Sequence, residues 1–144
     1  MWEPIFSIDE ISGTVNFDKM LFWYPSQLIR PWTECIIEGT IDFIYGHGNA
    51  VFQKCLILVK KPIANQVNII TADRRKTLRT NTGLSIQICT MGATANINWL
   101  KSSMHSTFLG RPWREYSTTF IHSYLGRIIH LEGLLGWAAR PSII

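Results

Sequence analysis

The sequence predicts an all-β fold. Short runs rich in Ile, Val, Phe and Thr recur between turn residues, and no long helical periodicity interrupts them. Hydrophobic residues make up 47% of the chain and charged residues 17%, which favours a packed interior over disorder. The predicted strands are Ile41–Tyr45, Ala50–Val59, Val67–Ala72, Leu84–Met91, Thr118–Leu125 and Arg127–His130.

The connections between these runs have their own signals. Residues 46–49, Gly-His-Gly-Asn, and residues 81–83, Asn-Thr-Gly, include residues that tolerate a positive φ, and Lys61-Pro62 ends the run before it. The segment Gly92–Thr107 is polar and poorly patterned, so it is predicted to be a long loop. The regular recurrence of strands fits a stacked-coil solenoid as well as a β-sandwich, and the pattern alone leaves both open.

The length of 144 residues predicts one domain, and its net charge of +4 is unevenly distributed. Residues 1–34 contain five acidic and two basic residues, a balance of −3, whereas residues 35–144 contain twelve basic and five acidic residues, a balance of +7. A basic body favours a polyanionic partner, and nucleic acid, anionic lipid and acidic polysaccharide all qualify by charge.

The cysteines and the apolar segments exclude several classes of protein. Cys35, Cys55 and Cys89 are odd in number and have no Cys-x-x-Cys spacing, so no metal site is expected. Buried free thiols are the default interpretation, although Cys35 and Cys55 can form a bridge if they stack on adjacent coils. No apolar stretch approaches the roughly 20 residues of a membrane-spanning helix, and the N-terminus does not resemble a secretory signal.

Two motifs include the candidate catalytic residues. Asp42 lies in an apolar, strand-like run between Gly39 and Gly46, and Arg111 lies in the sequence Leu-Gly-Arg-Pro-Trp, residues 109–113. The planar guanidinium of an arginine can hold a carboxylate bidentately and keep it ionised. If the fold brings Asp42 and Arg111 together, the pair forms an oriented anionic nucleophile. The serines lack a Gly-x-Ser-x-Gly elbow, and Gly46-x-Gly48 is too short a pattern for nucleotide binding.

These motifs resemble those of the plant pectin methylesterases. The block from Cys35 to Gly46 is similar to that family's pattern of Cys, a spacer and Gly-Thr-Val-Asp-Phe-Ile-Phe-Gly. Residues 51–55, 66–72 and 81–87 continue the resemblance in order, and residues 109–117 match its most diagnostic block. The resemblance covers roughly Glu34 to Trp137.

The resemblance implies a right-handed parallel β-helix, here a partial solenoid, that hydrolyses methyl esters of galacturonate in pectin without metal or cofactor. It implies that Asp42 is the nucleophile, that Arg111 holds it, and that Trp113 lines the sugar subsites. Tyr45 stands where phenylalanine is common in the family. Trp137 resembles the second tryptophan of the family's Gly-Trp-x-x-Trp block, in which Leu134 replaces the first, and both sugar binding and core packing stay open for it. The implied partners are pectin (homogalacturonan) and a proteinaceous pectinesterase inhibitor, with no nucleic acid or membrane. The implied location is the plant cell wall or extracellular space.

The sequence departs from the family pattern upstream of Cys35. Members of the family have a Gln-Asp-Thr-Leu-Tyr motif there, whose aspartate is the general acid and base and whose glutamine contributes to the oxyanion hole. No matching motif is found between Met1 and Glu34, and the family's later C-terminal strands are not found after Ile144. The sequence therefore predicts an N-terminal segment of unassigned role, residues 1–34, and a partial β-helix domain, residues 35–144.

Three hypotheses about function follow from these observations. The first is a truncated pectinesterase that keeps the nucleophile and its arginine but turns over slowly or not at all. The second is a non-catalytic pectate-binding or decoy β-helix, and the third is an incomplete chain without a stable fold.

Overall fold

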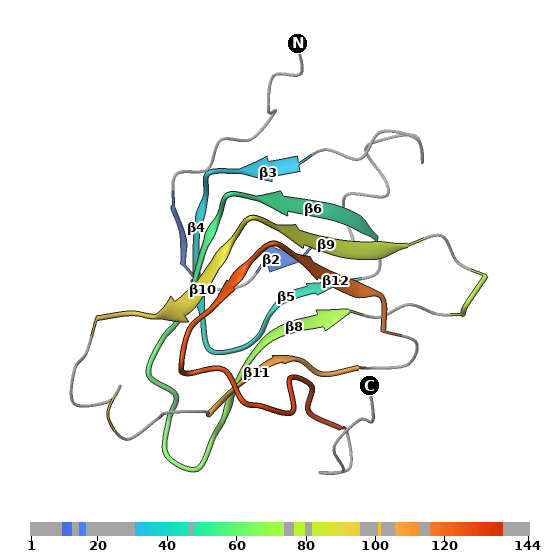
Figure 1. Ribbon diagram of the computed structural model, residues 1–144. Coiled ribbons are helices and arrows are strands. Elements are labelled where there is room, and N and C mark those ends of the chain that lie inside the picture. The colour runs from blue at the N-terminus through green and yellow to red at the C-terminus, as the bar shows by residue number, and fades with distance from the viewer. Residues whose placement is uncertain are drawn as a thin grey trace.

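The computed structural model describes residues 10–12, 15–16, 31–46, 48–73, 77–79, 82–95, 101, 106–112 and 116–136. The described residues form thirteen short strands in a parallel β-helix (Figure 1). In chain order they are β1 Glu10–Ser12, β2 Val15–Asn16, β3 Pro31–Thr33, β4 Ile36–Gly39, β5 Ile41–Gly46, β6 Asn49–Gln53, β7 Leu56–Val59, β8 Asn68–Asp73, β9 Gly83–Gln87, β10 Thr90–Ala93, β11 Thr107–Gly110, β12 Thr118–Ile121 and β13 Tyr124–Leu125.

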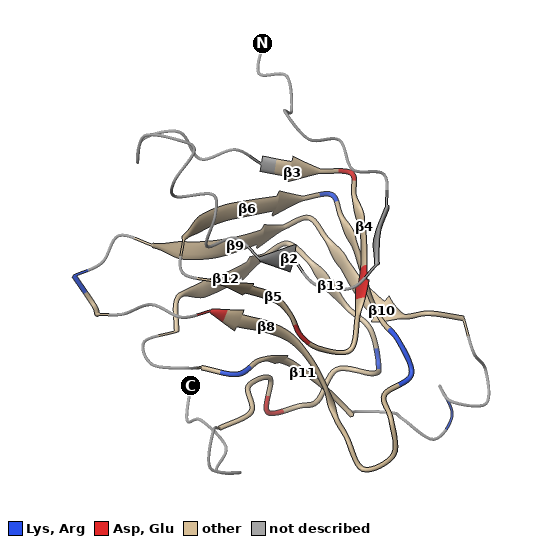
Figure 2. Ribbon diagram, turned by 180° about the vertical axis from the view of Figure 1, so that it is seen from behind, with Lys and Arg blue, Asp and Glu red and all other residues tan. Residues whose placement is uncertain are grey.

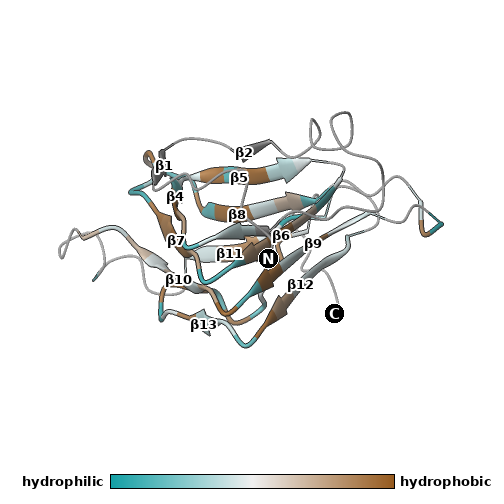
Figure 3. Ribbon diagram, turned by 90° about the horizontal axis from the view of Figure 1, so that it is seen from above, coloured by the Kyte–Doolittle hydropathy of each residue, from teal (hydrophilic) through white to brown (hydrophobic). Residues whose placement is uncertain are grey.

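The strands stack into three parallel sheets. The first sheet has the order β1-β4-β7-β10-β13, the second β11-β8-β5-β2, and the third β12-β9-β6-β3. Each coil visits the sheets in turn, as β4, β5 and β6 do before β7 begins the next coil. Figure 3 shows the three sheets as separate faces around a common interior. The stacked-coil alternative, rather than the sandwich, is therefore correct.

The interior is built from ladders of like residues on successive coils. Ile37, Ile57 and Met91 are in register across β4, β7 and β10, and all three are fully buried. Phe52 and Ile86 form a second ladder on the third sheet. Because each coil contacts only its neighbours, this repetition supplies most of the hydrophobic stabilisation of the fold.

The corner between the third and first sheets breaks three runs that the sequence predicted as continuous. One residue per coil adopts a positive φ there, and none is glycine: Glu34 (57°), Lys54 (53°), Ile88 (54°) and His122 (45°). The predicted run Ala50–Val59 is therefore split into β6 and β7, Leu84–Met91 into β9 and β10, and Thr118–Leu125 into β12 and β13.

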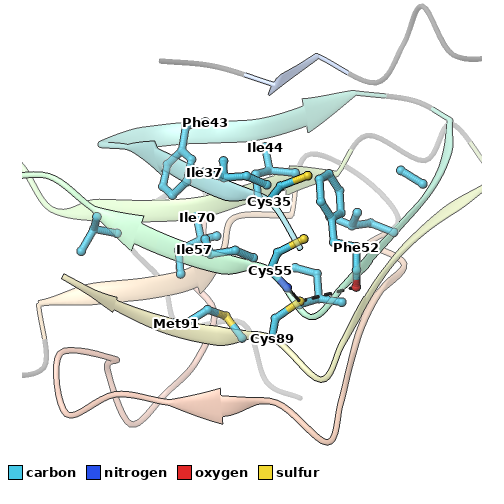
Figure 4. Close-up of a cluster of buried hydrophobic side chains, with 14 of the residues drawn as sticks. Cys35, Ile37, Phe43, Ile44, Phe52, Cys55, Ile57, Ile70, Cys89 and Met91 are labelled. Carbon is cyan, nitrogen blue, oxygen red and sulfur yellow. Dashed lines mark hydrogen bonds between the residues drawn. The ribbon is translucent and has the colours of Figure 1, made fainter. Parts of the chain in front are cut away.

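Cys35, Cys55 and Cys89 stack at this corner, one residue after each positive φ (Figure 4). All three are free and buried. The backbone N–H of Cys55 lies 3.4 Å from the Cys89 sulfur, and the Cys89 N–H donates to Ser123 Oγ at 3.1 Å. The hydrogen bond to Cys89 and burial raise the pKa of the Cys55 thiol. The cysteines are thus a structural ladder within the core.

The end of the described chain differs from the prediction. Residues 127–130 were predicted as a strand, but they form a turn in which Ile129 makes an isolated bridge to Thr107. Hydrogen bonds from His130 to Thr107 and from Leu109 to Gly133 place this turn along the outer edge of β11. The segment therefore covers part of that edge without lengthening a sheet.

Among the described helices, none has the length and apolar character to cross a membrane.

Candidate active site

Asp42 lies on a β-bulge at the start of β5. Asp42 and Phe43 together oppose the single residue Ile70 of β8, so the ladder contains one extra residue on the β5 side. Phe43 and the following Ile44 are consequently both buried, and Asp42 keeps a partly exposed side chain. Asp42 has a φ of 49°, which is unfavourable for a residue with a Cβ. Bulges and strained residues of this kind are concentrated next to active sites, where they redirect a side chain.

The glycine before the bulge is required by packing. A Cβ added to Gly39 would collide with the ring of Phe43. Phe43 can therefore turn into the core only above a residue without a side chain. This contact explains the glycine that opens the Gly-Thr-Ile-Asp motif.

Arg111 follows the last residue of β11 and forms an ion pair with Asp42. Nη2 of Arg111 donates to Oδ2 of Asp42, and the Arg111 backbone N–H donates to the Thr71 carbonyl at 3.0 Å. The two side chains are 23% and 20% exposed, so solvent or a ligand can reach the pair. Figure 2 shows that charged residues are sparse on the described strands and lie mostly in connections and at strand ends. The predicted pairing of Asp42 and Arg111 is present in the structure.

The second oxygen of Asp42 has a different environment. Oδ1 is buried and makes no hydrogen bond among the residues that the structure describes. A buried polar atom without a partner is costly, and such atoms are often explained by a catalytic role or an additional ligand. One oxygen is held by arginine, which orients the carboxylate, while the other is unpaired among the described residues. This arrangement suits an oriented carboxylate nucleophile.

The other predicted site residues fall into two groups. Tyr45 is half-buried on β5, three residues after Asp42 and in register with Ala72 of β8. Trp113 and Trp137 lie outside the described residues. The roles of Tyr45, Trp113 and Trp137 therefore stay predictions.

The structure also reveals residues beside Arg111 that the sequence analysis missed. The Tyr116 hydroxyl lies 2.7 Å from Thr71 Oγ1, and the fully buried Asp73 accepts hydrogen bonds from Ser117. Burial raises the pKa of Tyr116 to about 12. Asp73 is the last residue of β8 and lies inside the protein. The only sequence signal was that Tyr116 and Ser117 fall inside the diagnostic block around Arg111.

Fold and site together define a class. Among the described side chains there is no cluster of three His, Cys, Asp or Glu that could hold a metal ion. What the structure presents is a parallel β-helix whose outer surface carries an Asp–Arg pair on coils that are separated by one intervening coil. Comparison with known proteins identifies the family within that class.

The family model described as Pectinesterase matches residues 14–143. The chain is 45% identical over 115 residues to pectinesterase/pectinesterase inhibitor PPE8B of Prunus persica, a match that covers 79% of this chain and 22% of the relative. It is 46% identical over 116 residues to the probable pectinesterase/pectinesterase inhibitor 47 of Arabidopsis thaliana, covering 79% of this chain and 18% of the relative. The chain belongs to the Pectinesterase family.

The solved structures agree with this assignment. Pectin methylesterase from carrot superposes with a TM-score of 0.69 at 34% identity, covering 88% of this chain and 39% of that one. The rice weevil pectin methyl esterase superposes with a TM-score of 0.67 at 21% identity, covering 82% and 36%, and shows the same fold. The predicted right-handed parallel β-helix is thereby confirmed. The chain spans about a fifth of the length of the curated relatives that it matches.

Proposed function

We propose that this chain contributes the nucleophile side of a pectin methyl ester hydrolase. Asp42 attacks the ester carbonyl of a methylated galacturonate unit, and Arg111 orients the carboxylate. The observation that carries this proposal is the Asp42–Arg111 ion pair on a strained bulge, within a fold of the Pectinesterase family.

The reaction proceeds in two steps. A carboxylate oxygen of Asp42 adds to the carbonyl carbon, the bond from that carbon to the methoxy oxygen breaks, and the methoxy group leaves as methanol after taking a proton. Water then hydrolyses the acyl-aspartate, which releases the galacturonate carboxylate and regenerates Asp42. Arginine suits the first step because it keeps the attacking carboxylate ionised and aimed.

The departing methoxy group needs a proton donor. Positioned general acid catalysis contributes about 10² to 10⁴ in rate, and an oxyanion donor about 10² to 10³. On the side of β5 that faces away from β8 lies β2, and residues 17–30 after β2 are outside the described part of the chain. Since residues 1–34 lack the family's Gln-Asp motif, we expect turnover to be slow or undetectable.

Methanol release from highly methylated pectin tests both statements. The purified chain and its Asp42→Asn variant would be assayed side by side, with circular dichroism to verify folding of each. We expect at most slow release, and we expect the substitution to remove whatever release is measured. Rapid methanol release that depends on Asp42 would refute the expectation of slow turnover. Release that persists in the variant would refute the role of Asp42 as the nucleophile.

A second function, retention of pectate without catalysis, is supported by charge. Residues 35–144 have a balance of +7, and electrostatic binding to carboxylates requires only fixed positive charge. Binding should weaken as salt rises, because exposed charges are screened over about 8 Å at physiological ionic strength. It should also be weaker for highly methylated pectin, whose carboxylates are masked. Equal affinity for both polymers, or no dependence on salt, would contradict this function.

We also propose the plant cell wall as the setting and a pectinesterase inhibitor protein as a partner. Two of the relatives are plant proteins whose names include both pectinesterase and pectinesterase inhibitor, which supports the pairing. Co-purification of this chain with a plant inhibitor domain, compared with the Asp42→Asn variant, would test the partner.

A further inference from the structure

The segment that includes Arg111 is attached to one strand at both ends. β11 ends at Gly110, and the backbone N–H of Arg111 donates to the Thr71 carbonyl of β8. The chain returns to β8 at residues 116–117, which contact Thr71 and Asp73. β8 lies between β5 and β11 in the second sheet, so it separates the strand of Asp42 from the strand that leads to Arg111. A contact to β8 therefore fixes the Arg111 segment relative to Asp42.

The first of these contacts joins Tyr116 to Thr71. Thr71 Oγ1 lies 2.8 Å from the Leu109 carbonyl and donates its proton to it. A threonine hydroxyl has one proton, so the Tyr116 hydroxyl must be the donor in the 2.7 Å contact with Thr71. A Cβ on Gly110 would collide with both hydroxyl oxygens, which explains why glycine precedes Arg111. Burial of Tyr116 makes a lost partner costly.

The second contact joins Ser117 to Asp73. Oδ2 of Asp73 accepts from the Ser117 backbone N–H at 2.9 Å and from its hydroxyl at 3.0 Å. The single proton of the Ser117 hydroxyl is shared between Asp73 Oδ2 and the Thr82 carbonyl, which is 2.7 Å away at the start of β9. Asp73 has no exposed surface, and losing a hydrogen bond between buried groups is costly. The return point of the segment is thus held at a buried carboxyl group.

The ion pair between Asp42 and Arg111 does not by itself fix the position of Arg111. Both partners are partly exposed, and exposed ion pairs contribute little because solvent screens them and long side chains lose entropy. A displacement of about 1 Å at a reacting group can cost about 10² in rate. The position of Arg111 therefore depends on its backbone anchors.

We propose that Thr71, Asp73, Tyr116 and Ser117, here called the β8 latch, are positioning residues that hold Arg111 against Asp42. The hydrogen bonds of the four residues join them to one another, to Leu109 and to Thr82, so they act through the segment that they anchor. The importance of the latch for catalysis rests on the proposed function. Its effect on the position of Arg111 does not, because that position can be measured without turnover.

Arginine modification tests the latch directly. The chain would be treated with phenylglyoxal, and the rates at Arg111 and at the exposed Arg127 would be followed by peptide mass spectrometry. Tyr116→Phe removes only the hydroxyl, and Ser117→Ala removes only the hydroxyl that Asp73 and the Thr82 carbonyl share. Tyr124→Phe, an exposed tyrosine on β13, is the matched control. We expect the Arg111 rate, relative to Arg127, to rise about fivefold in the latch variants, as for the loss of one net hydrogen bond, and to stay unchanged in the control.

The Asp42→Asn variant separates this proposal from the proposed function. We expect it to raise Arg111 reactivity with the latch intact, because the guanidinium loses its carboxylate; no rise would contradict the role of the pair. The latch is overturned if Tyr116→Phe keeps the wild-type ratio of Arg111 to Arg127. A parallel rise at both arginines would mean general loosening and would also overturn it. If Ser117→Ala does not fold, Tyr116→Phe alone decides the outcome.

Discussion

Asp42 and Arg111 pair across β8, although 69 positions separate them in the sequence. Three coils of the helix contribute to this contact, since β5, β8 and β11 belong to successive turns. The bulge directs Asp42 outward, and the end of β11 brings Arg111 to it. A solenoid is well suited to such a pair because its register fixes the distance between equivalent positions on neighbouring coils.

The ion pair should matter more for function than for stability. We expect Asp42→Asn to change the free energy of unfolding by less than about 1 kcal/mol, because the pair is partly exposed and asparagine also tolerates a positive φ. Urea denaturation of the wild type and the variant measures this difference. A loss of several kcal/mol would show instead that the charge of Asp42 is a structural requirement.

Gly110 should be intolerant of a side chain. We expect Gly110→Ala to destabilise the protein by about 1 to 3 kcal/mol, since its Cβ overlaps the hydroxyl oxygens of Tyr116 and Thr71. In a Tyr116→Phe background the same change should cost less, because one of the two clashing atoms is gone. A double-mutant cycle by denaturant unfolding gives this coupling energy. Strictly additive effects would mean that Gly110 is not packed against the tyrosine hydroxyl.

The stability of the protein should fall between about pH 10 and pH 12 through Tyr116. Burial raises the folded-state pKa of Tyr116 to about 12, above the ordinary value of 10. The neutral phenol therefore contributes stability that is fully present below pH 10 and is lost as pH rises through the folded-state pKa. Thermal unfolding across this window should show a smaller decline in Tyr116→Phe than in the wild type. Identical pH profiles would contradict the burial of this hydroxyl.

The sequence predicts the fold class and the Asp42–Arg111 pair because both depend on local patterns. Runs of β-branched residues mark the strands, and the contexts of Asp42 and Arg111 are specific enough to identify each residue. The β8 latch was not predictable, since Thr71 and Asp73 meet their partners only after the coils stack. Tyr116 and Ser117 lie 45 and 44 positions away from them. No local signal announces such a contact.

The corners were missed for a different reason. A positive φ is expected at glycine or asparagine, whereas Lys54 and Ile88 are neither and lie within predicted apolar strands. Their conformation is imposed by the coil, which must turn between the third and first sheets at this point. Hydrogen bonds from Lys54 to Gln87 and from Ile88 to Ile121 repeat the same geometry on successive coils. Tertiary stacking therefore overrides local preference at these residues.

Ile88 offers a way to stabilise the protein. It combines a β-branched side chain with a φ of 54°, and it is 56% exposed, so little packing is lost when it is replaced. The left-handed conformation costs an ordinary residue about 1 to 2 kcal/mol, and asparagine tolerates it better. We expect Ile88→Asn to raise the free energy of unfolding by about 1 kcal/mol. The control is Ile121→Asn, at a similarly solvent-facing position on the extended strand β12, where the same change should be neutral or destabilising. Denaturant unfolding of both variants decides the matter, and a loss of stability in Ile88→Asn equal to that in Ile121→Asn would show that the corner stores no backbone strain.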